Sequence, residues 1–273
     1  MIQQDYNNRD VDFSRIHAIH PIHFELFLDN IFSQKHKKII DIGGGYGGVL
    51  LACLDRSSSL EIDQYTIIEP YAQQISKGKE LLNGQAGFEA IRNNFKYIKS
   101  SFLDYAPLSD TFDQAILKMA LHEFPKNQQI QVLEKCFSLL KPGGYLNLWM
   151  PHLTETTHPF FTEVIRQKDL AAGFQELASQ RYFSSDTTLR NNAAAVGWKV
   201  DKPTFIFEYI LDTRLRLDSE FKNQPQAYQR WLERIIKTYE QSSDKLKDEV
   251  PIMKVPNGVA IRFQRAIYKL HKV

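Results

Sequence analysis

The chain has few cysteines, no long apolar run and no excess of charge of one sign, and each absence excludes a class of protein. Its 273 residues include two cysteines, Cys53 and Cys136, which excludes a disulfide-stapled fold. A membrane span would need about 18 consecutive apolar residues, and none occur. The formal net charge is +2, whereas proteins that grip phosphate backbones are usually far more basic. The N-terminus is polar and lacks the apolar core of a signal peptide, so we expect a cytoplasmic globular protein without membrane contact. Nucleic acid is a poor first guess as its partner.

Short apolar strands alternate with helices over the first half of the chain. The expected strands of this half are 38–42, 65–68, 95–98, 112–117 and 145–150. Helices are expected between them at 49–54, 71–82 and 127–140. This βαβ spacing predicts an α/β fold with a doubly wound, mostly parallel sheet. Two later segments alternate in hydrophobicity, 205–210 and 259–268, and are expected to supply the last strands.

A glycine-rich turn, DIGGGYGG over residues 41–48, joins the first strand to its helix. It fits both the dinucleotide pattern G-x-G-x-x-G and the pattern D-x-G-x-G-x-G. A plain turn is disfavoured because so many glycines carry a large entropy cost. Asp41 suits a cationic ammonium better than a pyrophosphate, which favours helix N-termini free of negative charge. Glu69, at the end of the second strand, can accept hydrogen bonds from both hydroxyls of a ribose.

Four segments in order resemble the motifs of the class I S-adenosylmethionine-dependent methyltransferases. They are IIDIGGGYG, TIIEP, FDQAILKMALHEFP and LLKPGGYLNLWMP, within residues 38–151. The resemblance implies a Rossmann-like seven-stranded sheet with an antiparallel last strand, helical cap elements, and S-adenosylmethionine as cofactor. It implies one methyltransferase domain over 1–273. The core is expected at about 37–151, 184–210 and 256–273, and the cap at about 1–36, 152–183 and 211–255.

The resemblance also assigns the cofactor site. The residues it implies are Asp41, Gly43, Gly44, Gly45, Gly47, Glu69, Pro70, Ser101, Phe102 and Lys118. The chain departs from the family after the third strand, where an acidic residue often binds the adenine amino group. Ser101 takes that position, so either Ser101, the Phe102 backbone or the nearby Asp104 serves adenine. No metal site is expected, because His17, His20 and His23 lack a carboxylate or cysteine partner.

Two histidines follow strands at the edge where open α/β sheets bind ligands. His122 follows the fourth strand and is either a general base for the acceptor or a packed turn residue. His152 follows the fifth strand and is the weaker candidate, because Pro151 can aim the chain away. Tyr6 and Arg15 precede the core, in a segment expected partly to cover the cofactor.

We therefore expect a methyltransferase for a small, partly apolar acceptor, with oxygen favoured as the attacking atom. Aromatic residues of the cap form the acceptor pocket, the ordinary core of the cap, or the face of a homodimer. The alternatives are an RNA or protein methyltransferase, and a cofactor-binding protein without catalysis. A nicotinamide-dependent dehydrogenase is disfavoured by Asp41 and by the segment 112–151.

Overall fold

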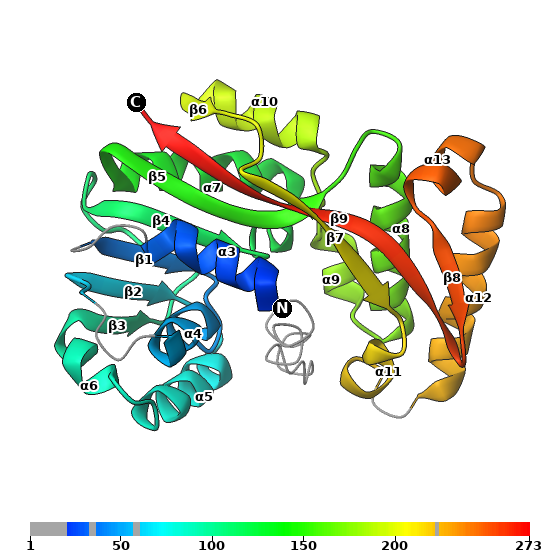
Figure 1. Cartoon of the computed structure of the whole chain (residues 1–273), viewed down its shortest axis with the longest axis horizontal. Helices are drawn as coiled ribbons and strands as arrows, with labels where there is room; N and C mark the ends of the chain where they lie inside the picture. Colours follow the sequence, from blue (N-terminus) through cyan, green and yellow to red (C-terminus); the bar gives the residue numbers. More distant parts are fainter. Residues whose placement is uncertain (1–20, 33–36, 57–60, 222–223) are drawn as a thin grey trace.

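The computed structural model describes residues 21–32, 37–56, 61–221 and 224–273. Its sheet begins with five parallel strands in the order β3-β2-β1-β4-β5 (Figure 1). They are β1 (Lys38–Ile42), β2 (Gln64–Ile68), β3 (Phe95–Ile98), β4 (Phe112–Lys118) and β5 (Leu140–His152). The α/β fold with a mostly parallel central sheet is thus confirmed. The order places the carboxyl ends of β1 and β4 side by side, where a ligand site is expected.

Helices cover both faces of this parallel part. Those that follow its strands are α4 (Gly48–Arg56), α5 (Ala72–Asn83), α6 (Phe88–Ile91) and α7 (Lys126–Leu139). The later helix α10 (Asp186–Val196) packs beside α7. None of the helices within the described ranges is long and apolar enough to cross a membrane.

The helix before the first strand, α3 (Pro21–Phe32), is a buried part of the core. Phe27, Leu28 and Ile31 are fully buried and pack with residues of β1 and α4. The Gln114 amide of β4 also donates to the Ile31 carbonyl at 2.9 Å. Residues 1–20, where the rest of the expected cover falls, lie outside the described residues. The described part of this segment therefore packs on the core, and its Phe24 also lines the cavity beside the glycine-rich turn.

The main path of the sheet has seven strands, as expected, and two further strands pair with it off this path, so that nine strands form one sheet among the described residues. The long last strand, β9 (Gly258–Lys272), runs antiparallel to β5 and has partners along both edges. Its other partners are the expected strand β7 (Phe205–Asp212) and two strands that were not expected, β6 (Trp198–Val200) and β8 (Ile252–Val255). β6 was missed because it has three residues, too few to show an alternating pattern.

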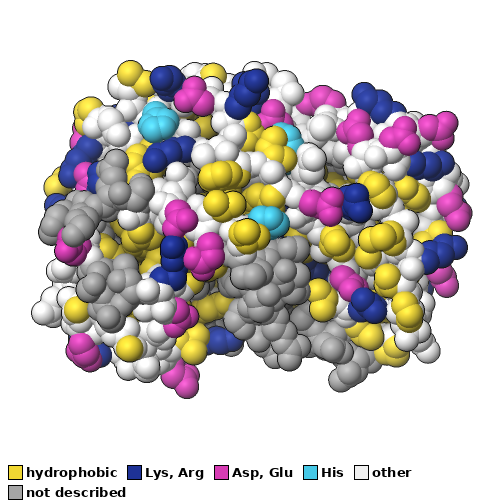
Figure 2. All heavy atoms as spheres, viewed as in Figure 1, with side chains coloured by type: hydrophobic (Ala, Val, Ile, Leu, Met, Phe, Trp, Pro, Cys, Tyr) yellow, Lys and Arg dark blue, Asp and Glu magenta, His cyan; other side chains and the backbone are white. Residues whose placement is uncertain are grey.

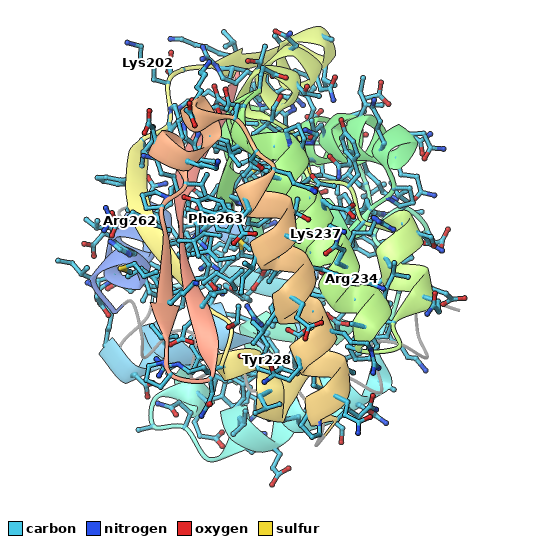
Figure 3. The ribbon with its side chains drawn as sticks, turned by 90° about the vertical axis from the view of Figure 1, so that its right-hand side faces the viewer. Lys202, Tyr228, Arg234, Lys237, Arg262 and Phe263 are labelled. Carbon is cyan, nitrogen blue, oxygen red and sulfur yellow. The ribbon has the colours of Figure 1, made fainter. Side chains whose placement is uncertain are left out.

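The amino-terminal half of β9 leaves the parallel core and carries the cap. The cap helices are α8 (Thr157–Ala171), α9 (Gln175–Gln180), α11 (Leu215–Ser219), α12 (Pro225–Glu240) and α13 (Asp244–Glu249). Figure 3 shows Phe263 of β9 between the strand and α12, with Arg262 on the opposite side. β7, expected in the core, extends into the cap, since Tyr209 and Leu211 belong to the cap's apolar cluster. One strand pair therefore links core and cap.

Candidate cofactor and acceptor site

The glycine-rich turn between β1 and α4 adopts a backbone that other residues rarely allow. Gly43, Gly45 and Gly47 have φ values of +64°, +57° and +83°, in the left-handed region that favours glycine. A Cβ at Gly44 would lie 2.9 Å from Asp41 Cγ, closer than real Cβ contacts. The turn therefore needs glycine both for its conformation and for its close approach to Asp41.

Two buried carboxylates frame this turn. The Tyr65 hydroxyl donates to Asp41 Oδ2 at 3.0 Å. Glu69 accepts from the Gly45 N–H at 2.9 Å and from the Tyr71 N–H at 3.0 Å, one bond on each carboxylate oxygen. A carboxylate has about four lone-pair positions, so Glu69 keeps acceptor capacity for two further donors. Burial raises the pKa of Asp41 to about 6 and that of Glu69 to about 7.

The raised pKa of Asp41 makes the stability of the wild type depend on pH. The usual pKa of 3.8 applies in the unfolded chain, and about 6 applies in the folded protein. The folded state holds the proton more tightly, so the stability present in acid is lost as the pH rises through about 6. Asp41→Asn stays neutral and should escape this loss. We expect the melting temperature of the wild type to fall relative to that of the variant between acid and neutral pH.

Melting curves of both proteins across this range would check the prediction. Glu69 titrates in both, so the difference between the two proteins largely removes its contribution. A difference in melting temperature that stays constant with pH would contradict the assignment.

A cavity of about 550 Å³ opens beside the turn. All the expected cofactor-site residues line it except Gly47, whose Cβ position faces the Tyr97 hydroxyl. Ser101 and the buried Phe102 lie in its wall, whereas Asp104 is exposed and does not line it. Of the alternatives left open for adenine, the structure thus brings Ser101 and Phe102 to the cavity.

Lys118, the last residue of β4, also lines this cavity. Its ammonium lies over the rings of Phe24 and Trp149, at 5.4 Å and 5.6 Å from their centroids. Burial and the nearby Arg265 lower its pKa to about 7. The next residue, Met119, has a φ of +55°, which non-glycine residues adopt at a cost of about 1–3 kcal/mol. No pattern in the sequence indicates this backbone strain in the cavity wall.

The structure separates the two candidate histidines. His122 lines the cavity, with its ring stacked on Phe183 at 4.6 Å. His152 lies outside the cavity wall, and its Nδ1 is 3.0 Å from the Tyr268 hydroxyl. Successive side chains of a strand point to opposite faces, so His152 points away from the face on which Trp149 reaches the cavity. Of the two candidate histidines, only His122 therefore lines the cavity.

Ion pairs fix the position of the turn that carries His122. His122 Nε2 is 3.2 Å from Glu123 Oε1, and Arg181 pairs with the same carboxylate at 2.6 Å. Arg181 also pairs with Asp169 at 2.9 Å, which ties the turn to α8. Burial raises the pKa of Glu123, but Arg181 and His122 outweigh burial and hold it well below its usual range. Glu123 therefore remains ionised and orients the imidazole.

The far wall of the cavity comes from the cap, and the sequence did not assign it. Its residues are Phe161, Ile165, Lys168, Gln180, Arg181, Phe183, Tyr209, Leu211, Arg216, Glu220 and Arg265. The sequence does contain a signal for one of these residues. Arg265 is a charged residue at an inward position of β9, a strand with an alternating pattern. The cap thus supplies both apolar and charged groups to the site.

The N-terminal histidines do not form a metal site in the described part of the chain. His23 stacks on Phe207 at 4.1 Å, which is a packing contact. His17 and His20, like Tyr6 and Arg15, lie outside the described residues. Among the described residues, no group of three histidine, cysteine or acidic side chains is placed to hold a metal ion.

Residues 40–146 match the family model described as a methyltransferase domain. A 24-methylenesterol C-methyltransferase of Arabidopsis thaliana is 28% identical over 193 residues, 71% of this chain and 48% of that protein. A ubiquinone biosynthesis O-methyltransferase of Vibrio parahaemolyticus is 26% identical over 138 residues, 50% of this chain and 52% of that protein. The chain thus spans about half the length of these curated relatives.

Solved structures agree in fold. A putative methyltransferase from Bacillus halodurans superposes with a TM-score of 0.72 at 13% identity, covering 90% of this chain and 96% of that one. At this identity the likeness concerns the fold alone. The matched segment contains the glycine-rich turn, both framing carboxylates and the strand that leads to His122. This chain therefore contains a methyltransferase domain over residues 40–146, and its motifs resemble those of the class I S-adenosylmethionine-dependent methyltransferases.

Proposed function

We propose that this protein transfers a methyl group from S-adenosylmethionine to a small acceptor held beneath the cap. One observation carries the proposal: the walls of a single cavity combine the cofactor motifs of the core with side chains of the cap. Its volume of about 550 Å³ lies within the range of small-molecule sites. A methyl donor and a compact acceptor would meet inside it.

The residues on the core side fit this cofactor. Glu69 keeps acceptor positions for the ribose hydroxyls, and Asp41 supplies negative charge near the positively charged methionine part. When bound, the cofactor supplies an activated methyl on a sulfonium with a neutral leaving group. The protein then has to hold the two reactants in line, which is worth about 7–11 kcal/mol. His122 would accept the acceptor's proton where the acceptor arrives protonated.

Glu69→Ala is expected to weaken binding of S-adenosylhomocysteine about 10- to 100-fold. The variant loses the bonds to the ribose hydroxyls and also the two backbone bonds that hold the turn. Isothermal titration calorimetry of the folded variant measures the effect. Glu61→Ala is the matched control, because Glu61 is exposed and does not line the cavity. If the Glu69 variant and the wild type bind S-adenosylhomocysteine with equal affinity, Glu69 is not part of the cofactor site.

A small acceptor is favoured over RNA or protein as the substrate. Cap residues line the acceptor side of the cavity, and on the face in Figure 2 Lys and Arg side chains lie among Asp and Glu. Methyl transfer from labelled cofactor into a metabolite extract, total RNA and a protein extract separates these classes. Label in the metabolite fraction supports the proposal, and label confined to RNA or protein overturns it. Product analysis of the labelled metabolite then identifies the attacking atom, for which we propose oxygen.

A further inference from the structure

Arg265 is a charged residue on an inward face of β9. Alternate residues of a strand share a face, so Phe263, Arg265 and Ile267 point the same way. Ile267 belongs to the apolar cluster of the core, and Phe263 belongs to that of the cap. Arg265 thus lies at the junction of the two clusters, where it lines the cavity. A charge at such a position costs free energy unless a partner offsets it.

The guanidinium has no such partner among the described residues. Arg265 is 7% exposed, forms no ion pair or hydrogen bond with a described side chain, and has a buried Nε without an acceptor. Its central carbon lies 3.4 Å from the centroid of the Tyr209 ring. This stack covers one face of the planar guanidinium, whereas its N–H donors lie in the plane and remain suited to an acceptor.

The other cations of the cap wall are already neutralised. Lys168, Arg181 and Arg216 each form an ion pair of 2.9 Å or less with a carboxylate. These carboxylates are thereby committed, and Arg265 remains as the surplus positive charge on this side of the cavity. Burial lowers the pKa of the Arg265 guanidinium, the direction expected for a buried cation without a carboxylate beside it.

We propose that Arg265 binds a carboxylate of the acceptor, so that the substrate is a small monocarboxylate with an apolar body. The proposal rests on the proposed function, since it names the acceptor class of the same site. Guanidinium and carboxylate match in two parallel hydrogen bonds, which would fix the acceptor's orientation as well as its charge. Phe161, Phe183 and Leu211 line the same cavity and would contact the apolar body.

The cofactor carries a carboxylate of its own, which shares this chemistry. We assign Arg265 to the acceptor because its stacking partner is Tyr209 of the cap cluster. In the strand register Arg265 lies opposite Phe207 of β7, on the far side of β5 from the glycine-rich turn. If Arg265 binds the carboxylate of the cofactor, its substitution should weaken cofactor binding. If it binds the carboxylate of the acceptor, cofactor binding should not change, so a binding experiment separates the two.

The test uses calorimetry with benzoate and its uncharged analogue benzamide, on protein with and without saturating S-adenosylhomocysteine. The wild type should bind benzoate at least about tenfold more tightly than benzamide. Arg265→Gln should abolish this preference and leave the affinity for S-adenosylhomocysteine unchanged. Arg262→Gln is the matched control, because Arg262 lies on the same strand, is 45% exposed and pairs with Glu208. It should keep the preference.

Three results would overturn the proposal. A wild type that binds benzamide as tightly as benzoate has no carboxylate site, whatever the variants do. If Arg265→Gln keeps the preference for benzoate, the carboxylate site lies elsewhere. If Arg265→Gln weakens the binding of S-adenosylhomocysteine but not that of 5′-methylthioadenosine, which lacks the carboxylate, Arg265 belongs to the cofactor site.

If the glutamine variant does not fold, Arg265→Lys should keep the charge and a reduced preference for benzoate. Failure of S-adenosylhomocysteine to bind the wild type would count against the proposed function alone, because benzoate is also measured without it.

Discussion

Trp231→Ala is expected to lower the free energy of unfolding by about 3–5 kcal/mol, the range for removing a large buried aromatic residue. Trp231 of α12 is fully buried in the cap cluster. It packs against Phe221 and Tyr228, with ring centroids 5.5 Å and 6.0 Å away. Its Nε1 donates to the Val164 carbonyl at 3.1 Å, so the substitution also leaves a buried acceptor without its donor.

Urea unfolding followed by circular dichroism measures this effect. Lys237→Ala is the matched control, because Lys237 lies on the same helix and is exposed, and surface substitutions usually change stability by about 0.5 kcal/mol or less. The cap shares β9 with the core, so we expect the loss in the main unfolding transition. A change for Trp231→Ala no larger than that of the control would show that the cap core contributes little to global stability.

His122→Ala is expected to lower kcat by about 10²- to 10⁴-fold, the usual contribution of general-base catalysis, if the acceptor reacts through a hydroxyl. His122 lines the cavity, and Glu123 holds its imidazole in place. His122 is not among the residues expected to bind the cofactor, so the affinity for S-adenosylhomocysteine should stay close to that of the wild type. His122→Gln should be no better than the alanine variant, since it keeps polarity and loses basicity.

His152→Gln is the matched control for this experiment. His152 lies near the sheet's carboxyl edge but does not line the cavity, so its loss should leave kcat near the wild-type value. Single-turnover rates with the acceptor found in the labelled extract compare the three variants. Near-wild-type kcat for His122→Ala would mean that His122 is a packed turn residue and that orientation alone drives the reaction.

The sequence by itself determined the residues on the cofactor side of the cavity. The glycine-rich turn, Asp41 and Glu69 each stand at the end of a short apolar strand. Their relative placement follows from local chain geometry, since parallel strands bring their carboxyl ends to one edge. Contiguous residues and strand ends were therefore enough to predict the doubly wound core and the wall of the cavity that carries the motifs.

Only the tertiary structure decided the acceptor side. His122 reaches the cavity from the turn after β4, whereas His152 lies on β5 and points to the other face of the sheet. Arg265 meets the cavity because β9 is long enough to pair with β5 along one half and to carry the cap on the other. Such contacts join residues far apart in the sequence, such as Phe207 and Arg265, and their geometry depends on strand register and twist. No short pattern encodes these distances, whereas every cofactor motif lies within a few residues of a strand end.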